Sequence, residues 1–150
     1  MTASTIAPTR AALVAEARQW IGTPYRHQAS LKGVGADCLG LVRGLWRALH
    51  GPEIEALPAY APDWAEATGC DTLASAARAH LLEVDPLAAR PGDVLLFRWR
   101  DGLPAKHAGI LATPASFIHA YDGSAVVESP LAPWWRRRLA CAFAFPGIVD

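Results

Sequence analysis

One cysteine and two histidines are the residues of this 150-residue sequence best suited to chemistry. Cys38 directly follows Asp37, after a glycine-rich stretch, at the predicted N-terminus of a helix. The unpaired N–H groups and the positive dipole end at such a terminus stabilise a thiolate, so we expect this position to lower the thiol pKa. The same N–H groups can stabilise an oxyanion that forms on an attacked carbonyl. Cys38 is therefore a candidate nucleophile.

A nucleophilic cysteine needs a base, and His107 and His119 are placed to supply it. His107 lies near the start of a predicted strand, and His119 follows 12 positions later in the next strand, with the Thr113-Pro114 turn midway between them. Antiparallel strands joined by that turn bring the two histidines face to face. In this interpretation His107 takes the thiol proton and later protonates the leaving amine. His119 accepts a hydrogen bond from the other ring nitrogen of His107 and fixes its tautomer.

Each of these residues also has a structural interpretation. Cys38 alone fits an inert buried cysteine, and a histidine in a strand fits a hydrogen-bonded, half-buried side chain. One cysteine and two histidines also fit a zinc site. The helix-terminal cysteine and the paired histidines together favour the catalytic interpretation about as much as the structural ones. The spacing of the residues alone does not decide between them.

Helices are predicted in the first half of the chain and strands in the second. Apolar residues at helical spacing predict helices between Thr9 and Gly22, from Asp37 to Gly51, and over 72–82, with a loop at 22–36 and an irregular segment at 52–70. Short apolar or alternating runs predict strands at 93–99, 105–112, 116–121, 124–128 and 139–145. This order indicates an α+β fold with the helices on one side of an antiparallel sheet of about five strands. The length fits a single domain over 1–150.

The composition argues against several classes of protein. Fourteen basic residues balance fourteen acidic ones, whereas a general nucleic-acid binder carries a basic excess. Three scattered cysteines without a CxxC pair do not fit a disulfide framework or a zinc knuckle. The longest apolar stretch, 139–149, is far below the ~20 residues of a membrane span, and the first 20 residues show no secretory signal. We expect a protein made in the cytoplasm without a signal peptide, with no membrane insertion, nucleic-acid partner, metal or cofactor.

Four motifs, in the same order along the chain, resemble the NlpC/P60 family of cysteine peptidases. The segments at 22–26 (GTPYR) and 37–42 (DCLGLV) resemble the nucleophile region of that family. The segment at 90–97 (RPGDVLLF) is similar to its first core strand. The segments at 107–110 (HAGI) and 117–120 (FIHA) resemble the strands that carry the catalytic histidine and the third polar residue. The resemblance covers roughly residues 13–128.

The resemblance implies a papain-like α+β fold and a cysteine endopeptidase that cleaves the stem peptide of bacterial peptidoglycan through a thioester acyl-enzyme. The usual target in the family is the bond between D-glutamate and the following diamino acid. The resemblance also implies that Tyr25 forms a hydrogen bond near the nucleophile and helps to form the oxyanion environment. Asp37 is expected among the residues that surround this environment. The phage-encoded branch of the family is the most similar. It implies phage tail proteins as partners, and delivery to the wall by a phage particle or by release at lysis.

The departures from the family pattern lie in the predicted substrate groove and affect specificity rather than the triad. Leu39 replaces the serine of the family, and His27 and Gln28 stand where the family has an aromatic residue and a glycine. Trp134, followed by Trp135 and three arginines, has two interpretations. One is a strand edge whose aromatic side chains cover the sheet, and the other is a groove wall that packs against substrate.

Two other functions fit the same residues. An amidase or acyltransferase acting on lipid or small amide substrates would use the same Cys38–His107–His119 triad, because acyl transfer shares the first half-reaction. A non-catalytic domain would instead bind zinc through these residues or serve as a part in phage tail assembly.

Overall fold

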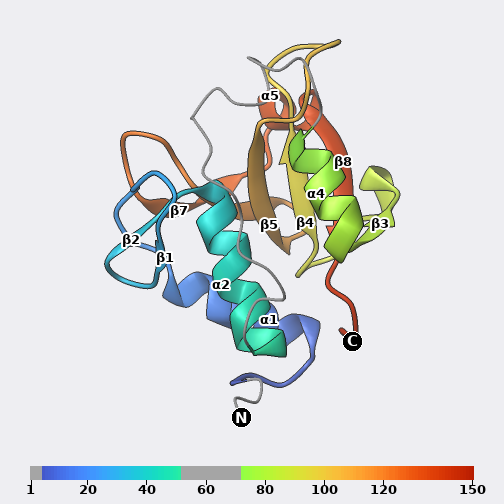
Figure 1. Cartoon of the computed structure of the whole chain (residues 1–150). Helices are drawn as coiled ribbons and strands as arrows, with labels where there is room; N and C mark the ends of the chain where they lie inside the picture. The colour runs from blue at the N-terminus through green and yellow to red at the C-terminus, as the bar shows by residue number, and fades with distance from the viewer. Residues whose placement is uncertain (1–4, 52–71) are drawn as a thin grey trace.

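The computed structural model describes residues 5–51 and 72–150, so the prediction for 52–70 lies outside the described residues. The helical elements are α1 (Arg10–Gln19), α2 (Cys38–His50), α4 (Thr72–His80), the short 3-10 helix η1 (Pro86–Ala88) and α5 (Pro133–Arg136). The strands are β1 (Ser30–Leu31), β2 (Gly35–Ala36), β3 (Leu82–Val84), β4 (Val94–Phe97), β5 (His107–Thr113), β6 (Ser116–Ala120), β7 (Val126–Pro130) and β8 (Leu139–Ala144). Figure 1 shows α1 and α2 beside the sheet formed by the second half of the chain.

The main sheet has six antiparallel strands in the order β3-β8-β4-β5-β6-β7. The predicted α+β fold with helices on an antiparallel sheet is confirmed, but the expectation of about five strands is wrong. The additional strand is β3, where Leu82 pairs with Ala144 of β8 instead of ending the preceding helix. Leu82 and Glu83 are both exposed, so no alternation of buried and exposed residues marks this short edge strand in the sequence.

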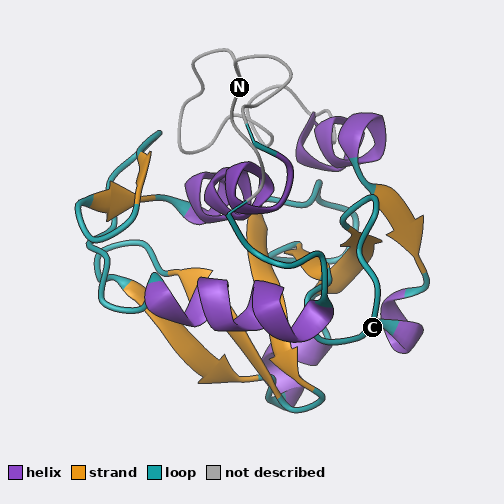
Figure 2. Ribbon diagram, turned by 90° about the horizontal axis from the view of Figure 1, so that it is seen from below, coloured by secondary structure: helices purple, strands orange, loops and turns teal. Residues whose placement is uncertain are grey.

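Alternating side chains of the strands point into two separate cores, one on each face of the sheet. On one face, apolar residues of α1, α2 and α4 pack against those of the central strands; they include Leu13, Leu41, Leu45, Leu73, Val94, Ile110 and Ile118. On the other face, Leu95, Phe97 and Phe117 pack together with Trp135 of α5. Three helices therefore cover one face as predicted, while α5 lies on the opposite face (Figure 2).

The predicted starts of the first two helices are confirmed by their caps. Oγ1 of Thr9 accepts a hydrogen bond from the backbone N–H of Ala12 at 3.1 Å, in front of α1. Asp37 caps α2 in the same way, so that Cys38 is the first residue of that helix. The predicted loop at 22–36 contains the short hairpin of β1 and β2.

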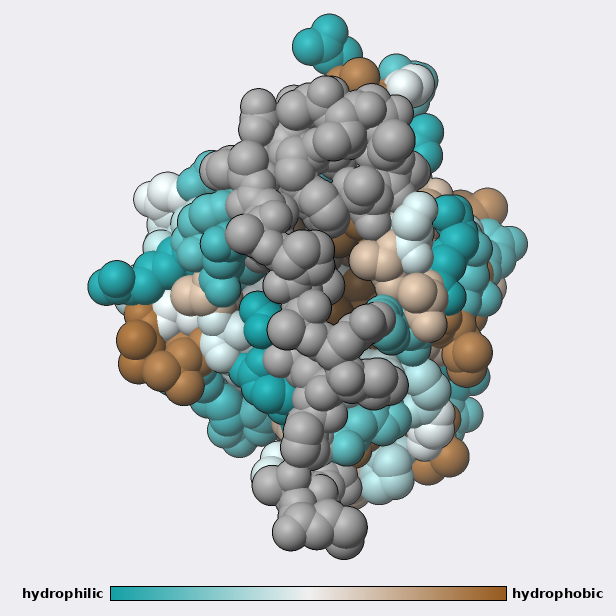
Figure 3. Space-filling model, viewed as in Figure 1, coloured by the Kyte–Doolittle hydropathy of each residue, from teal (hydrophilic) through white to brown (hydrophobic). Residues whose placement is uncertain are grey.

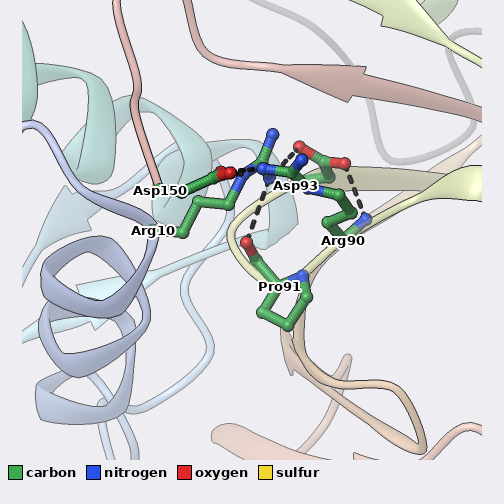
Figure 4. Close-up of polar contacts among 5 residues, drawn as sticks. All are labelled: Arg10, Arg90, Pro91, Asp93 and Asp150. Carbon is green, nitrogen blue, oxygen red and sulfur yellow. Dashed lines mark hydrogen bonds and ion pairs between the residues drawn. The ribbon is translucent and has the colours of Figure 1, made fainter.

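A cluster of charged side chains around Asp93 fastens α1 and the C-terminus to the start of β4 (Figure 4). Asp93 is 2% exposed, and its Oδ1 atom accepts a hydrogen bond from Nη1 of Arg10 at 2.7 Å. Its Oδ2 atom accepts from the backbone N–H of Arg90 at 2.8 Å. Arg10 also donates to the carbonyl of Pro91, and Asp150 pairs with both arginines. Asp93 thus joins α1 to the turn before β4, and the two arginines link this turn to the C-terminus.

On the face shown in Figure 3, hydrophobic residues are scattered among hydrophilic ones around the grey segment. Within the described parts of the chain, none of the helices has the length and apolar character needed to cross a membrane.

Candidate active site

Cys38 is held at the N-terminus of α2 by hydrogen bonds to Asp37. Oδ1 of the buried Asp37 carboxylate accepts from the backbone N–H of Gly40, and Oδ2 accepts from the backbone N–H of Gln28, both at 2.7 Å. A Cβ atom on Gly40 would lie 1.8 Å from the carbonyl oxygen of Ala29, so only glycine lets the preceding loop pack on this turn. One carboxylate therefore fixes both the helix start and the loop beside the thiol.

The hairpin in front of α2 is attached to the same helix. Nη2 of Arg47 donates to the carbonyl oxygen and to Oγ of Ser30, at 2.6 and 2.8 Å. Oγ of Ser30 in turn donates to the carbonyl of Gly40 at 2.6 Å. These bonds tie β1 to the turn of helix that follows Cys38, so the surroundings of the thiol are rigidly connected.

Backbone groups at the start of α2 lower the pKa of Cys38, as expected, but the net shift is upward. Removal from water raises the thiol pKa to about 12, and the negative charge of Asp37 raises it further in the same direction. Backbone groups of Ala108, Leu39 and Cys38 itself oppose this shift but are outweighed. The contact with Ala108 also shows where the sulfur lies, since Ala108 follows His107 at the start of β5.

His107 and His119 are buried next to each other, as the spacing predicts. Nε2 of His107 lies 2.8 Å from Nδ1 of His119, and the side chains are 7% and 1% exposed. A Cβ atom on Gly109 would lie 3.3 Å from Cβ of His119, so His119 lies beside Gly109 and reaches His107 along the diagonal. Burial lowers the pKa of His107 to about 3, with a further contribution from His119, and lowers that of His119 to about 4. Both rings are therefore neutral at neutral pH.

Ser129 is a polar partner of the histidine pair that the sequence analysis missed. Its Oγ atom lies 2.8 Å from Nε2 of His119. The predicted strand at 124–128 stops one residue short of Ser129, whereas β7 extends to Pro130. Had the strand been extended, the alternation of side chains would have placed Ser129 on the same face as Val127, which pairs with His119.

Aromatic side chains surround His107 and account for its removal from water. The ring of Trp99 stacks on His107 with centroids 5.7 Å apart at 22°, and Trp135 lies 5.6 Å away at 31°. Phe97 and Phe117 complete this face, at 6.2 Å from His107 and 4.3 Å from His119, respectively. These aromatic residues are far apart in the sequence, since they come from β4 and the loop after it, from β6 and from α5.

Tyr25 lies near the thiol, as the family resemblance implies. It packs against the main core, and burial raises its pKa to about 12, with added contributions from the charges of Cys38, Asp122 and Asp37. The phenol is therefore protonated over the whole working range of pH and can donate a hydrogen bond. Asp37, by contrast, accepts two backbone N–H bonds, so its contribution is to hold the loop and the helix start.

The predicted groove residues lie at different places around this centre. His27 is exposed, with Nδ1 3.9 Å from Oδ2 of Asp37. Gln28 has a left-handed backbone with φ of 64°, and Leu39 is half-buried against the main core.

Trp134 and Trp135 belong to a short helix, so the strand-edge interpretation of this segment is wrong. Pro133 opens α5 at a position where its missing N–H costs nothing. The Trp134 side chain is 44% exposed, its ring lies 6.2 Å from that of Trp99, and the guanidinium of Arg138 stacks over it at 3.6 Å. The ring of Trp99 thus lies in contact with both Trp134 and His107.

The geometry of the histidine pair differs from that of a metal site. Nε2 of His107 and Nδ1 of His119 face each other in a hydrogen bond and do not converge on a common point. In the part of the chain that the structure describes, no three His, Cys, Asp or Glu side chains form a group that could hold a metal ion. A thiol, an imidazole pair, a phenol and a helix N-terminus are instead groups that can take part in acyl transfer.

The sequence of this chain is similar to those of several known proteins. Residues 22–144 match the model of the NlpC/P60 family. A gamma-DL-glutamyl hydrolase of Bacillus subtilis is 30% identical over 141 residues, which cover 91% of this chain and 30% of that protein. The murein DD-endopeptidase MepS/murein LD-carboxypeptidase of Escherichia coli K12 is 32% identical over 120 residues, which cover 79% of this chain and 54% of that protein. The chain therefore spans about half or less of the length of these curated relatives.

Solved structures show the same fold. The NlpC/p60 domain of the peptidoglycan hydrolase SagA aligns with a TM-score of 0.60 at 25% identity, over 91% of this chain and 99% of that domain. RipD of Mycobacterium tuberculosis, described as a non-catalytic NlpC/p60 domain protein, aligns with a TM-score of 0.55 at 15% identity, over 89% of this chain and 94% of that one. The likeness to RipD concerns the fold alone.

Proposed function

Because this chain belongs to the NlpC/P60 family, we propose that it is a cysteine peptidase that hydrolyses an amide bond in the stem peptide of peptidoglycan. The observation that carries the proposal is the hydrogen bond between Nε2 of His107 and Nδ1 of His119, buried where β5 meets the thiol-bearing end of α2. A non-catalytic domain has no need of a buried, dehydrated imidazole pair beside a cysteine. Strongly shifted titratable groups of this kind cluster at functional sites.

In the proposed mechanism, both reacting groups start neutral. As the sulfur of Cys38 attacks the substrate carbonyl, His107 takes the thiol proton, and the carbonyl π electrons move onto oxygen. The phenol of Tyr25 and N–H groups at the start of α2 stabilise this oxyanion. The tetrahedral intermediate then collapses to a thioester, and the C–N bond breaks as the imidazolium of His107 protonates the leaving amine. Water, deprotonated by His107, then attacks the thioester. The C–S bond breaks, the acid is released, and the proton on His107 returns to the sulfur of Cys38.

The proposed scissile bond joins D-glutamate to the following diamino acid. The names of the two curated relatives support this substrate class, since one refers to glutamyl hydrolysis and the other to murein. Mass spectrometry of muropeptides released from purified sacculi identifies the bond directly: a new terminus on D-glutamate supports the proposal, and a terminus at another residue corrects it.

The chemistry is tested with substitutions in the triad. We expect Cys38→Ala to abolish release of wall fragments and His107→Ala to reduce it almost as strongly. His119→Ala should reduce the release of wall fragments less than His107→Ala, because water can partly replace a group that only orients the base. Cys141→Ser, which removes a buried thiol far along the chain, is the matched control. A Cys38→Ala variant that is folded, as judged by circular dichroism, and still clears sacculi would refute the peptidase mechanism.

An amidase or acyltransferase remains the second candidate on the same side chains, and assays with lipid and small amide substrates separate it from the peptidase. A phage tail as carrier and synthesis without export remain predictions. None of the relatives named above refers to a phage. Detection of the chain in purified virions, or its absence from them, decides this point.

A further inference from the structure

His119 makes a second polar contact, on the side of its ring that points away from His107. Its Nδ1 atom faces His107, and its Nε2 atom lies 2.8 Å from Oγ of Ser129. Ser129 comes from the edge strand β7, in which Val127 pairs with His119. Residues two apart on a strand share a face, so the hydroxyl reaches the imidazole diagonally. Three neighbouring strands thus supply a continuous chain of hydrogen bonds from His107 through His119 to Ser129.

The direction of these hydrogen bonds decides whether His107 is able to act as a base. Since Nε2 of His107 is engaged with His119, Nδ1 is the ring nitrogen left for the thiol proton. A neutral imidazole carries one N–H, so a free Nδ1 requires the hydrogen on Nε2, which then donates to Nδ1 of His119. His119 must in turn carry its own hydrogen on Nε2 and donate it to Ser129.

If the hydrogen bonds ran in the opposite direction, His107 could not accept the thiol proton. A serine hydroxyl that donated to Nε2 of His119 would place the hydrogen of that ring on Nδ1. That N–H would point at Nε2 of His107, and the hydrogen of His107 would then occupy Nδ1, where the thiol proton has to go. Because burial keeps both rings neutral, the surroundings select between tautomers and not between charge states.

We propose that Ser129 is a positioning residue that accepts the hydrogen bond of His119 and thereby selects the tautomer of His107 with a free Nδ1. The inference rests on the proposed function, in which His107 is the base. A hydroxyl both accepts and donates, and Ser129 is only half-buried, so water can take its own proton. The site therefore needs an acceptor at the far end of the chain of hydrogen bonds, and Ser129 supplies it.

The test reads the tautomers directly, by NMR of the full chain labelled with nitrogen-15 in histidine. In the parent protein we expect His107 and His119 to carry their hydrogens on Nε2. Ser129→Ala should give mixed tautomers at both rings and lower kcat on muropeptides about tenfold, the equivalent of one hydrogen bond, with KM unchanged. Ser129→Thr keeps the hydroxyl and should restore both measurements.

The matched control is Ser116→Ala, which removes a hydroxyl from the adjoining strand. Oγ of Ser116 bonds to Thr113 and Glu128 and not to the histidines, so tautomers and kcat should stay at parental values. A hydrogen on Nδ1 of His119 in the parent, or parental tautomers and kcat in Ser129→Ala, would overturn the inference. If Cys38→Ala or His107→Ala remains active, the proposed function fails instead, and the parental tautomer spectrum distinguishes the two failures because it requires no activity.

Discussion

The carboxylate of Asp37 has two opposing effects on the thiol of Cys38, its neighbour in the chain. Asp37 caps the helix through Gly40 and thereby aligns the N–H groups that stabilise a thiolate. Its negative charge at the same time raises the pKa of Cys38, in the same direction as burial. The geometry of the nucleophile is therefore set by a group that disfavours its charged form, and the resting thiol is protonated.

The first prediction concerns the reactivity of the resting thiol. With a pKa of about 12, Cys38 should react with iodoacetamide at a rate that rises with pH from 6 to 10 without a plateau. Peptide-level mass spectrometry follows Cys38 separately from the other two cysteines. A plateau below pH 8 would show a preformed thiolate–imidazolium pair and contradict a mechanism that starts from neutral groups.

The second prediction concerns stability in acid. His107 and His119 have pKa values of about 3 and about 4 in the folded protein, against about 6.5 when unfolded. The unfolded chain therefore binds more protons below pH 6.5, so this stability is fully present above pH 6.5 and declines as the pH falls toward 4. We expect each histidine to contribute a loss on the order of 2 kcal/mol in the free energy of unfolding between pH 7.5 and 4.5.

Urea unfolding at the two pH values measures this loss. The variant His119→Gln removes one of the two titrating groups and should show a smaller loss than the parent. His27→Gln, at an exposed position, is the control and should lose as much as the parent. Equal losses in all three proteins would mean that folding does not lower the pKa of His119.

The third prediction concerns Gly109, which lies between the two histidines. A Cβ atom at this position would lie 2.8 Å from Cδ2 of Phe117 and 3.1 Å from the carbonyl oxygen of Ile118. Both atoms belong to a packed core, so Gly109→Ala should displace His119, lower stability by about 1–3 kcal/mol and reduce kcat in the fraction that folds.

A contrasting variant separates the two effects of Gly109→Ala. Gly102 has open space around it but a φ of 81°, so Gly102→Ala should cost roughly 1 kcal/mol through backbone strain. It should leave kcat unchanged, because the strain lies in a turn. Full activity of folded Gly109→Ala would show that the histidine contact tolerates displacement.

The parts of this site that follow local rules were predictable from the sequence. The Asp37 cap, the start of α2 at Cys38 and the approach of His107 to His119 depend on helix capping and on the two-residue period of strands. The resemblance to a family added Tyr25, which no local rule would have identified.

Ser129 was missed because the predicted strand ends at 128, one residue too early. The other parts that were missed depend on tertiary contacts. Trp99 and Trp135 approach His107 only when the strands and α5 pack together, and no spacing along the chain encodes that. The net rise of the thiol pKa was missed for a related reason. A helix N-terminus is visible in the sequence of Cys38, whereas its removal from water is a property of the folded protein.

The last prediction concerns the hydroxyl of Tyr25. Because the pKa of Tyr25 is about 12, the phenol is a hydrogen-bond donor at neutral pH, and the proposed mechanism uses it to bind the oxyanion. Tyr25→Phe should lower kcat about 100-fold, with little change in KM, because the lost bond forms mainly in the transition state. Alkylation of Cys38 should remain as fast as in the parent, since no oxyanion forms in that reaction. Tyr121→Phe, at a position that is 50% exposed, is the matched control and should keep the parental kcat. A drop in both kcat and alkylation rate would instead assign Tyr25 to the positioning of the thiol.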